Sequence, residues 1–385
     1  MDRVPLETLQ QIFQFACTDG GYTGGSLALT SRFIREAAQS TRFHSIAVGP
    51  ETERLTTLVA LYQSQCSNAT AGRPRTTHLY ISTSKPTEDD YDDSEDEEPA
   101  PARFVAIREL LHLVTADLQS LVITKDLFAA PRPLFARPLP ALRFLTLVRH
   151  PDPAALALVP PNSNSNHPDD SASSVAPLFP ALTHLHVVAQ SAPAPGPASA
   201  KHSPFFAGWA AHAPRVTHLR VSAHPRMYAL LEELPRALGT PPFRGFRAHT
   251  DAGEVGKVGA RTYPSLARVV VEPGAPPVRG ACGTSRLAYT QRSVQLHWLA
   301  AQAREVGVEM CVPAPCHCAR TEREWDGAVR EGWVRSIGGG DGGEAGGGWF
   351  DDEEEDNEDE EDVEKEESKE VGNEGLLPAR APRTA

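Results

Sequence analysis

A short pattern of apolar positions recurs along the middle of the chain and predicts a series of buried β-strands. Each copy has an apolar residue, two others, a second apolar residue, one other and a third apolar residue. The alternation at the end of the pattern is the spacing of one face of a strand. The tripeptide Thr-His-Leu occurs in three copies. The six copies lie at residues 75–82, 117–124, 139–148, 179–188, 213–222 and 263–272.

Segments with other apolar spacings complete the expected set of elements. Residues 42–48 and 306–312 are also rich in alternating apolar residues and predict a first and a last strand. Apolar residues at helical spacing predict helices between several of the strands. Strands that alternate with helices are joined by crossovers, so we expect a parallel sheet. The expected helices cover residues 53–65, 103–116, 227–238 and 294–304.

The repeated strands resemble a degenerate leucine-rich repeat array, in which each unit is a strand with a helical or irregular return. The copies are separated by about 24 to 50 residues, and the Asn of the standard repeat is missing. The alternative is an α/β domain with unrelated buried strands. The predicted fold class is α/β, with a small N-terminal helical module followed by an irregular leucine-rich-repeat-like solenoid that carries disordered acidic segments.

The residues that alternate with the apolar positions are expected on the opposite, concave face of the strands. Aromatic, imidazole and guanidinium groups gather at these positions, and such groups suit protein recognition. The alternative is a solvated sheet face without a dedicated ligand. The predicted target-binding residues are His78, Tyr80, Phe144, His184, His186, His218, Arg220 and Arg268.

Two amphipathic helices are predicted at the N-terminus, over residues 5–17 and 26–38. Pro5 suits the first helical position, and Ser26 can cap the second helix. The glycine-rich stretch between them is expected to end the first helix. Two helices of this size cannot bury a core of their own. They are therefore expected to pack on the rest of the chain, on another protein, or on both.

The order of residues in these helices resembles the F-box, the adaptor-binding module of ubiquitin ligases. That family reads Leu-Pro-x-Glu-(Ile/Leu)-Leu and later Leu-x-x-Val-(Cys/Ser)-(Lys/Arg) with an aromatic. This chain has VPLETL at residues 4–9 and LALTSRF at residues 27–33. It departs from the family at Val4, Thr8 and Thr30, and its aromatic comes one residue early. The resemblance covers about 45 of 385 residues and is greatest to F-box-like proteins of mushroom-forming fungi.

The resemblance implies a non-catalytic substrate-recognition adaptor whose N-terminal helices bind a Skp-type adaptor and, through it, a cullin. The repeat surface would then hold an unknown target protein. The alternative is a protein-binding scaffold without a ubiquitin-ligase role, whose N-terminal helices only cap the body. Some residues of the docking set must instead pack the helices together. The set that the resemblance suggests is Pro5, Leu6, Leu9, Ile12, Phe13, Leu27, Leu29, Ser31 and Phe33.

Composition divides the chain into a helical module (1–48), a body (49–315) and a mostly disordered Gly-rich and acidic tail (316–385). The net charge of −13 comes from two acidic runs, which carry −13 at residues 351–370 and −9 at residues 88–98 and leave the remainder at +9. Low apolar content predicts disordered insertions, because such segments cannot offset their ordering entropy. These insertions lie at about 84–102, 162–175 and 191–203.

The chain shows no motif for catalysis, and neither an enzyme activity nor a cofactor is expected. It has no nucleophile elbow and no phosphate-binding loop. The spacing of Cys311, Cys316, His317 and Cys318 does not match that of a zinc site. The cysteines are therefore expected to be ordinary reduced cysteines. Neither a secretory segment nor a membrane span is expected, and nucleic acid is not an expected partner. The chain is expected in the cytoplasm or the nucleus.

Overall fold

The described residues form an α/β fold and all lie within Met1–Phe350. The computed structural model describes residues 4–67, 73–82, 101–124, 134–135, 137–148, 176–189, 205–223, 228–241, 260–276, 283–314 and 322–338. The predicted insertions at 162–175 and 191–203, the residues Cys316, His317 and Cys318, and the acidic run at 351–370 lie outside these ranges.

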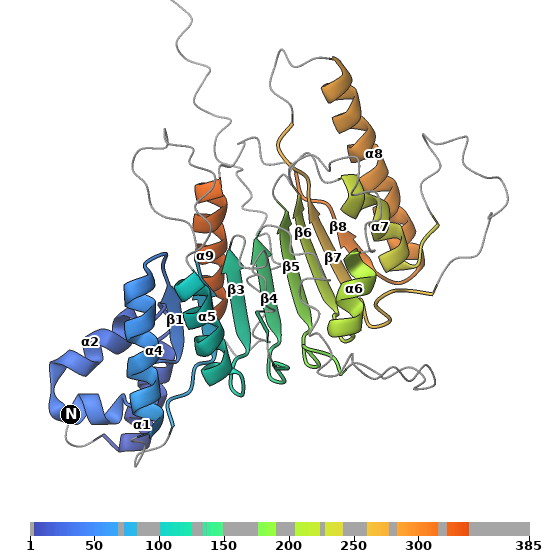
Figure 1. The fold of residues 1–385 in the computed structure, drawn as a ribbon. Helices are drawn as coiled ribbons and strands as arrows, with labels where there is room; N and C mark the ends of the chain where they lie inside the picture. The colour runs from blue at the N-terminus through green and yellow to red at the C-terminus, as the bar shows by residue number, and fades with distance from the viewer. Residues whose placement is uncertain are drawn as a thin grey trace, which may run out of the picture. The chain divides into compact units, whose positions relative to one another are not determined.

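A single eight-stranded sheet forms the centre of the fold, with its strands in sequence order (Figure 1). Every neighbouring pair is parallel, which confirms the parallel sheet expected from the sequence. Each of the eight predicted strand segments contains one strand. The strands are β1 (Ser45–Val48), β2 (His78–Ile81), β3 (Ser120–Thr124), β4 (Phe144–Val148), β5 (His184–Ala189), β6 (His218–Ala223), β7 (Arg268–Glu272) and β8 (Glu309–Cys311).

The register of the sheet aligns the repeated pattern from strand to strand. Leu79 of β2 pairs with Leu121 of β3, which pairs with Leu145 of β4. The same line continues across β5, β6 and β7. Side chains alternate between the two faces of a sheet, so residues two positions apart point to the same side. The line that begins at Ile81 therefore lies on the same face as the line that begins at Leu79. Both lines are buried in the main hydrophobic core.

Helices that connect the strands cover this apolar side of the sheet and complete the main core. Helix α6 was not predicted from the sequence. It contributes Trp209, which is fully buried and stacks on Phe179 with ring centroids 6.0 Å apart. The connecting helices are α4 (Thr52–Ser67), α5 (Pro101–Val114), α6 (Phe205–His212), α7 (Tyr228–Leu238) and α8 (Gly283–Glu305). The start of α5 overlaps the end of the insertion predicted at 84–102, whose boundary was therefore placed too late.

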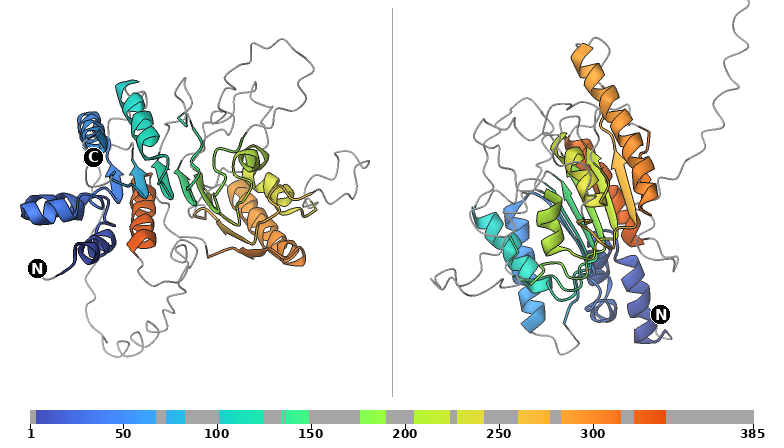
Figure 2. Two further views of the ribbon diagram at one scale, coloured as in Figure 1. Left: turned by 90° about the horizontal axis from the view of Figure 1, so that it is seen from below. Right: turned by 90° about the vertical axis from the view of Figure 1, so that its right-hand side faces the viewer.

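Helix α9 (Glu322–Gly338) lies on the opposite face of the sheet from α4 and α5 (Figure 2, left view). These residues were expected in the mostly disordered tail (316–385), and for 322–338 that prediction was wrong. Trp325, Val329 and Trp333 recur every four residues and form an apolar stripe on the helix. The glycines and charged residues between them hid this stripe in the sequence.

The N-terminal module contains three helices, α1 (Leu6–Ala16), α2 (Tyr22–Thr30) and α3 (Arg32–Ala37). The prediction of a single second helix over 26–38 was wrong. Asp19 accepts hydrogen bonds from the backbone N–H and the hydroxyl of Thr23, so α2 already begins within the glycine-rich stretch. Ser31 then adopts an extended conformation, with φ −155° and ψ 163°, which separates α2 from α3.

Candidate functional site

The three N-terminal helices pack around a small hydrophobic core that is separate from the core of the sheet. Leu9 and Phe13 of α1 meet Ile34, Ala37 and Ala38 of the α3 region, and all five are buried. Their spacing on α1 places them on one side of that helix. This small core orients α1 relative to α3 and leaves the remaining sides of the helices available for other contacts.

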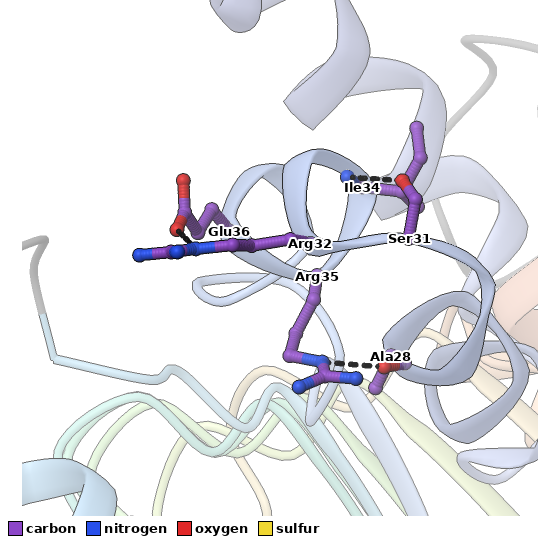
Figure 3. A network of polar contacts seen from close by, with 6 residues as sticks. All are labelled: Ala28, Ser31, Arg32, Ile34, Arg35 and Glu36. Atoms are coloured by element: carbon purple, nitrogen blue, oxygen red, sulfur yellow. Dashed lines mark hydrogen bonds and ion pairs between the residues drawn. The ribbon is translucent and has the colours of Figure 1, made fainter.

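Polar contacts fix the corner between α2 and α3 (Figure 3). Ser31 Oγ accepts a hydrogen bond from the backbone N–H of Ile34 at 3.1 Å and so caps the N-terminus of α3. Arg35 Nε donates to the Ala28 carbonyl oxygen at 2.7 Å, which ties α3 to the last turn of α2. The neighbouring Arg32–Glu36 ion pair is largely exposed and adds little stability.

The loop between α1 and α2 attaches the module to the first strand of the sheet. Ser45 Oγ donates to the Cys17 carbonyl at 2.7 Å and accepts from the Gly20 N–H at 2.9 Å. The Ala47 N–H donates to the Gly20 carbonyl at 2.9 Å, which extends the hydrogen bonding of β1 beyond the edge of the sheet. Burial raises the pKa of the Cys17 thiol to about 11, so the thiol stays neutral at this contact.

A polar cleft of about 850 Å³ shows which side of α1 faces the body. Glu7, Gln10 and Gln14 line it from α1, and Arg75 and Asp117 line it from the body. The polar side of α1 is therefore directed toward the sheet domain. Ile12 and Phe15 of the same helix do not line this cleft and are exposed.

The N-terminal module carries most of the exposed large apolar side chains among the described residues. The exposed fraction is 82% for Leu29, 81% for Tyr22 and 72% for Phe15, so most of each side chain is open to solvent. Large exposed apolar side chains that gather in one part of a folded protein suit an interaction site. We call these residues the apolar face: Val4, Leu6, Ile12, Phe15, Tyr22, Leu29 and Phe33.

The structure separates the predicted docking residues by burial. Four of them, Leu6, Ile12, Leu29 and Phe33, belong to the apolar face. Leu9 and Phe13 are 4% and 6% exposed and form the internal core of the module instead. Leu27 is half-buried at the edge of that core, whereas Pro5 and Ser31 are exposed. The oxygen of Ser31 is already engaged in the cap of α3.

Phe15 and Tyr22 were missed by the sequence analysis. Thr8, Ile12 and Phe15 follow one another at helical spacing, so a second apolar line next to Leu9 and Phe13 was present in the sequence. Tyr22 had no comparable signal, because it lies in the glycine-rich stretch that was expected to be a loop.

The predicted target-binding residues form two lines across the face of the sheet opposite the main core. One line contains His78, Phe144, His184, His218 and Arg268, and all five are half-buried. Phe144 stacks on His184 with centroids 4.5 Å apart, and His184 stacks on His218 at 4.3 Å. These contacts make the line a continuous stack of rings across β4, β5 and β6.

The second line contains Tyr80, His186 and Arg220, and two of its members are buried. Tyr80 lies beneath α9 and is 2% exposed. His186 Nε2 lies 2.9 Å from Ser222 Oγ and is 7% exposed. Arg220 pairs with Glu272. The sequence analysis therefore identified residues that share a face but could not tell which of them are covered.

Burial keeps the histidines of this face neutral. Desolvation, with a smaller contribution from neighbouring His218, lowers the pKa of His184 to about 3. Burial, followed by the effect of His44, likewise lowers the pKa of His78 to about 3. The pKa of His186 is also lowered, by burial first and then by Arg220. At neutral pH His78, His184 and His186 therefore carry no charge.

No group of three His, Cys, Asp or Glu side chains among the described residues is arranged to hold a metal ion. None of the described helices is long and apolar enough to cross a membrane. No model of a known protein family matches the chain, and no curated protein sequence matches it. The exposed apolar residues of α1–α3 form the candidate functional site.

Proposed function

We propose that this protein is a non-catalytic substrate-recognition adaptor of a Skp–cullin–F-box type ubiquitin ligase. Its helices α1–α3 would dock on a Skp-type adaptor in the cytoplasm or the nucleus, and the sheet body would hold a target protein. The observation that carries the proposal is the exposed apolar face, which includes Leu6, Ile12, Leu29 and Phe33. Leu6, Leu29 and Phe33 lie within the two segments that resemble the F-box motif, and Ile12 follows the first of these segments.

The composition of the apolar face favours a protein partner. Large aromatic and aliphatic side chains dominate the binding energy of protein interfaces, whereas charged residues are depleted from interface centres. Phe15, Tyr22 and Phe33 supply aromatic anchors from all three helices of the module. The small core beneath them holds these helices in fixed positions, so the anchors are arranged before a partner binds.

The regular body supports the second half of the proposal. Strands that follow one another in sequence order and in constant register resemble the stack of a leucine-rich-repeat-like solenoid. Such stacks present a long sheet face to a partner protein. The aromatic and imidazole stack of Phe144, His184 and His218 lies on that face and is half-buried, so it would form part of the contact.

A scaffold without a ligase role is the second candidate, and one observation favours it. The loop that contains Cys17 and Gly20 hydrogen-bonds to the outer edge of β1 and so covers the first strand of the sheet. A cap of this kind would explain the module without any adaptor. It does not explain the exposure of Phe15, Tyr22 and Leu29.

The test is a binding assay of the full chain with a purified Skp-type adaptor. Phe15→Asp combined with Leu29→Asp places two charges on the apolar face and should weaken binding at least about 100-fold, because desolvated charges at an interface centre are costly. Both side chains are exposed, so thermal stability should stay close to that of the wild type.

The matched control is Leu61→Asp, which changes an exposed leucine of α4 and should bind the adaptor like the wild type. Unchanged binding by the Phe15/Leu29 variant would refute the adaptor role and favour the scaffold. Substitutions at Leu9 or Phe13 are unsuitable for this test, because both side chains belong to the internal core and their loss would unfold the module.

A further inference from the structure

Helix α9 covers part of the sheet face that was expected to bind a target. It follows β8 in the sequence but packs at the other end of the sheet, next to β2 (Figures 1 and 2). Val329 and Trp333 are buried in one cluster with Tyr80 and Val122. The rings of Tyr80 and Trp333 lie 5.5 Å apart. Tyr80 is therefore inaccessible for as long as α9 stays in place.

A polar contact fixes the position of α9 along the strands. The Asp326 carboxylate accepts a hydrogen bond from the Tyr80 hydroxyl at 2.5 Å and another from the Ser82 hydroxyl at 2.9 Å. Burial raises the pKa of Tyr80, and the nearby Asp326 raises it further, so the hydroxyl remains a donor. The contact between the helix and the sheet thus has an apolar part at Trp333 and a polar part at Asp326.

Two features distinguish α9 from the core helix α5. Helix α5 buries seven of its residues, whereas α9 buries only Val329 and Trp333 among its described side chains. Gly327 and Gly332 face open space, so they lower helix propensity without serving a close contact. The helix therefore depends on its contact with the sheet for its structure.

We propose that the sheet face over β1–β3 is a helix-binding site and that α9 is its exchangeable occupant. The site would take an amphipathic helix of a partner protein, with apolar side chains at the spacing of Trp325, Val329 and Trp333. A carboxylate one residue after the first of these would replace Asp326. The inference rests on the proposed function, because it treats the sheet face as the target-binding surface, and it adds that α9 blocks part of this surface.

Release of α9 can be measured by hydrogen exchange on the wild-type full chain. If α9 is exchangeable, its amides should exchange at least about 100-fold faster than those of β3 and β4, through an opening that leaves the sheet intact. Equal exchange of α9 and β3 would overturn the proposal, because α9 would then open only with the whole domain. This measurement needs no variant, so a failure to fold cannot obscure it.

Binding of a partner helix can be measured with a labelled synthetic peptide of residues 322–338. Trp333→Ala in the full chain should open the site and raise its affinity for the peptide at least about tenfold over the wild type, because an occupied site reduces apparent affinity. Glu331→Ala changes an exposed residue of α9 and serves as the control that should match the wild type. A peptide that carries Trp333→Ala should not bind any of these proteins.

Equal affinity of the two peptides for the opened chain would overturn the helix-binding site. Neither measurement contains a Skp-type adaptor. A negative result in these assays therefore leaves the adaptor role of α1–α3 standing, and a failure of adaptor binding leaves the exchange of α9 measurable.

Discussion

Threonine and histidine form a small unit at the start of β5. Thr183 Oγ1 lies 2.9 Å from His184 Nδ1, and the same pair recurs in β6 as Thr217 and His218 at 2.9 Å. Each threonine orients the imidazole ring next to it. His184 and His218 stack nearly parallel, with 7° between their planes. In β5 and β6 the Thr-His pair of the repeated tripeptide thus orients the rings that stack between neighbouring strands, whereas Thr77 before β2 contacts His44 Nδ1 at 3.2 Å instead.

This stack predicts a loss of stability in weak acid. The pKa of His184 in the folded protein, about 3, lies below its value of about 6.5 in an unfolded chain. Between these values the unfolded state binds more protons, so stability is fully present above pH 6.5 and falls as the pH drops toward 3. Between pH 7.5 and 5.5, the free energy of unfolding of His184→Phe should therefore fall by about 1 kcal/mol less than that of the wild type.

Phenylalanine suits this test because Phe144 already occupies the neighbouring position on β4 and stacks on His184. Urea unfolding at pH 7.5 and at pH 5.5 measures the effect for both proteins. The interval lies above the ordinary pKa values of aspartate and glutamate, so carboxylates contribute little to the difference. An identical pH dependence of the two proteins would show that His184 does not titrate on unfolding in this interval.

At the scale of elements, helix α2 shows how a glycine-rich stretch can be helical. Gly24 is buried in α2, and a Cβ atom there would lie 2.2 Å from the Arg42 carbonyl oxygen. The position therefore accepts only glycine, because α2 packs directly on the backbone that leads into β1. Gly25 is the next residue of the same helix and has nothing within 4 Å of its Cβ direction.

These two glycines offer a matched pair of substitutions. Gly24→Ala should destabilise the N-terminal module by about 1–3 kcal/mol, since backbone must shift to relieve the overlap. Gly25→Ala should be neutral or stabilise it by up to about 1 kcal/mol, because alanine is the better helix former. Denaturation followed by a probe in the module measures both. A destabilisation of equal size would contradict the packing of α2 on Arg42.

The elements differ in how far the sequence predicts them, and the reasons are physical. Strands β1–β8 were predicted because buried parallel strands need the same apolar positions in every copy. Helix α9 was missed because only one side of it touches the protein and glycines separate its apolar residues. The break at Ser31 was missed because a cap depends on one side-chain hydrogen bond rather than on periodicity.

At the scale of the whole protein, the candidate site could be predicted only in part. The motif resemblance identified Leu6, Ile12, Leu29 and Phe33, but it could not separate them from Leu9 and Phe13. On a helix all such residues have similar spacing, and only the position of a neighbouring helix decides which side is buried. Likewise, the buried state of Tyr80 depends on α9, which comes from the far end of the chain.

The apolar face also predicts how the protein behaves without a partner. Exposed patches of large apolar residues promote association, so the free chain should self-associate with increasing concentration. Phe15→Asp combined with Leu29→Asp should abolish this self-association, whereas Leu61→Asp on α4 should leave it unchanged. Sedimentation velocity over a concentration series measures the effect. Equal self-association of all three proteins would show that a different surface is responsible for self-association. If a Skp-type adaptor dissociates the self-associated wild type and the Leu61→Asp protein into one-to-one complexes, the same face serves both contacts, which is the behaviour expected of a docking surface.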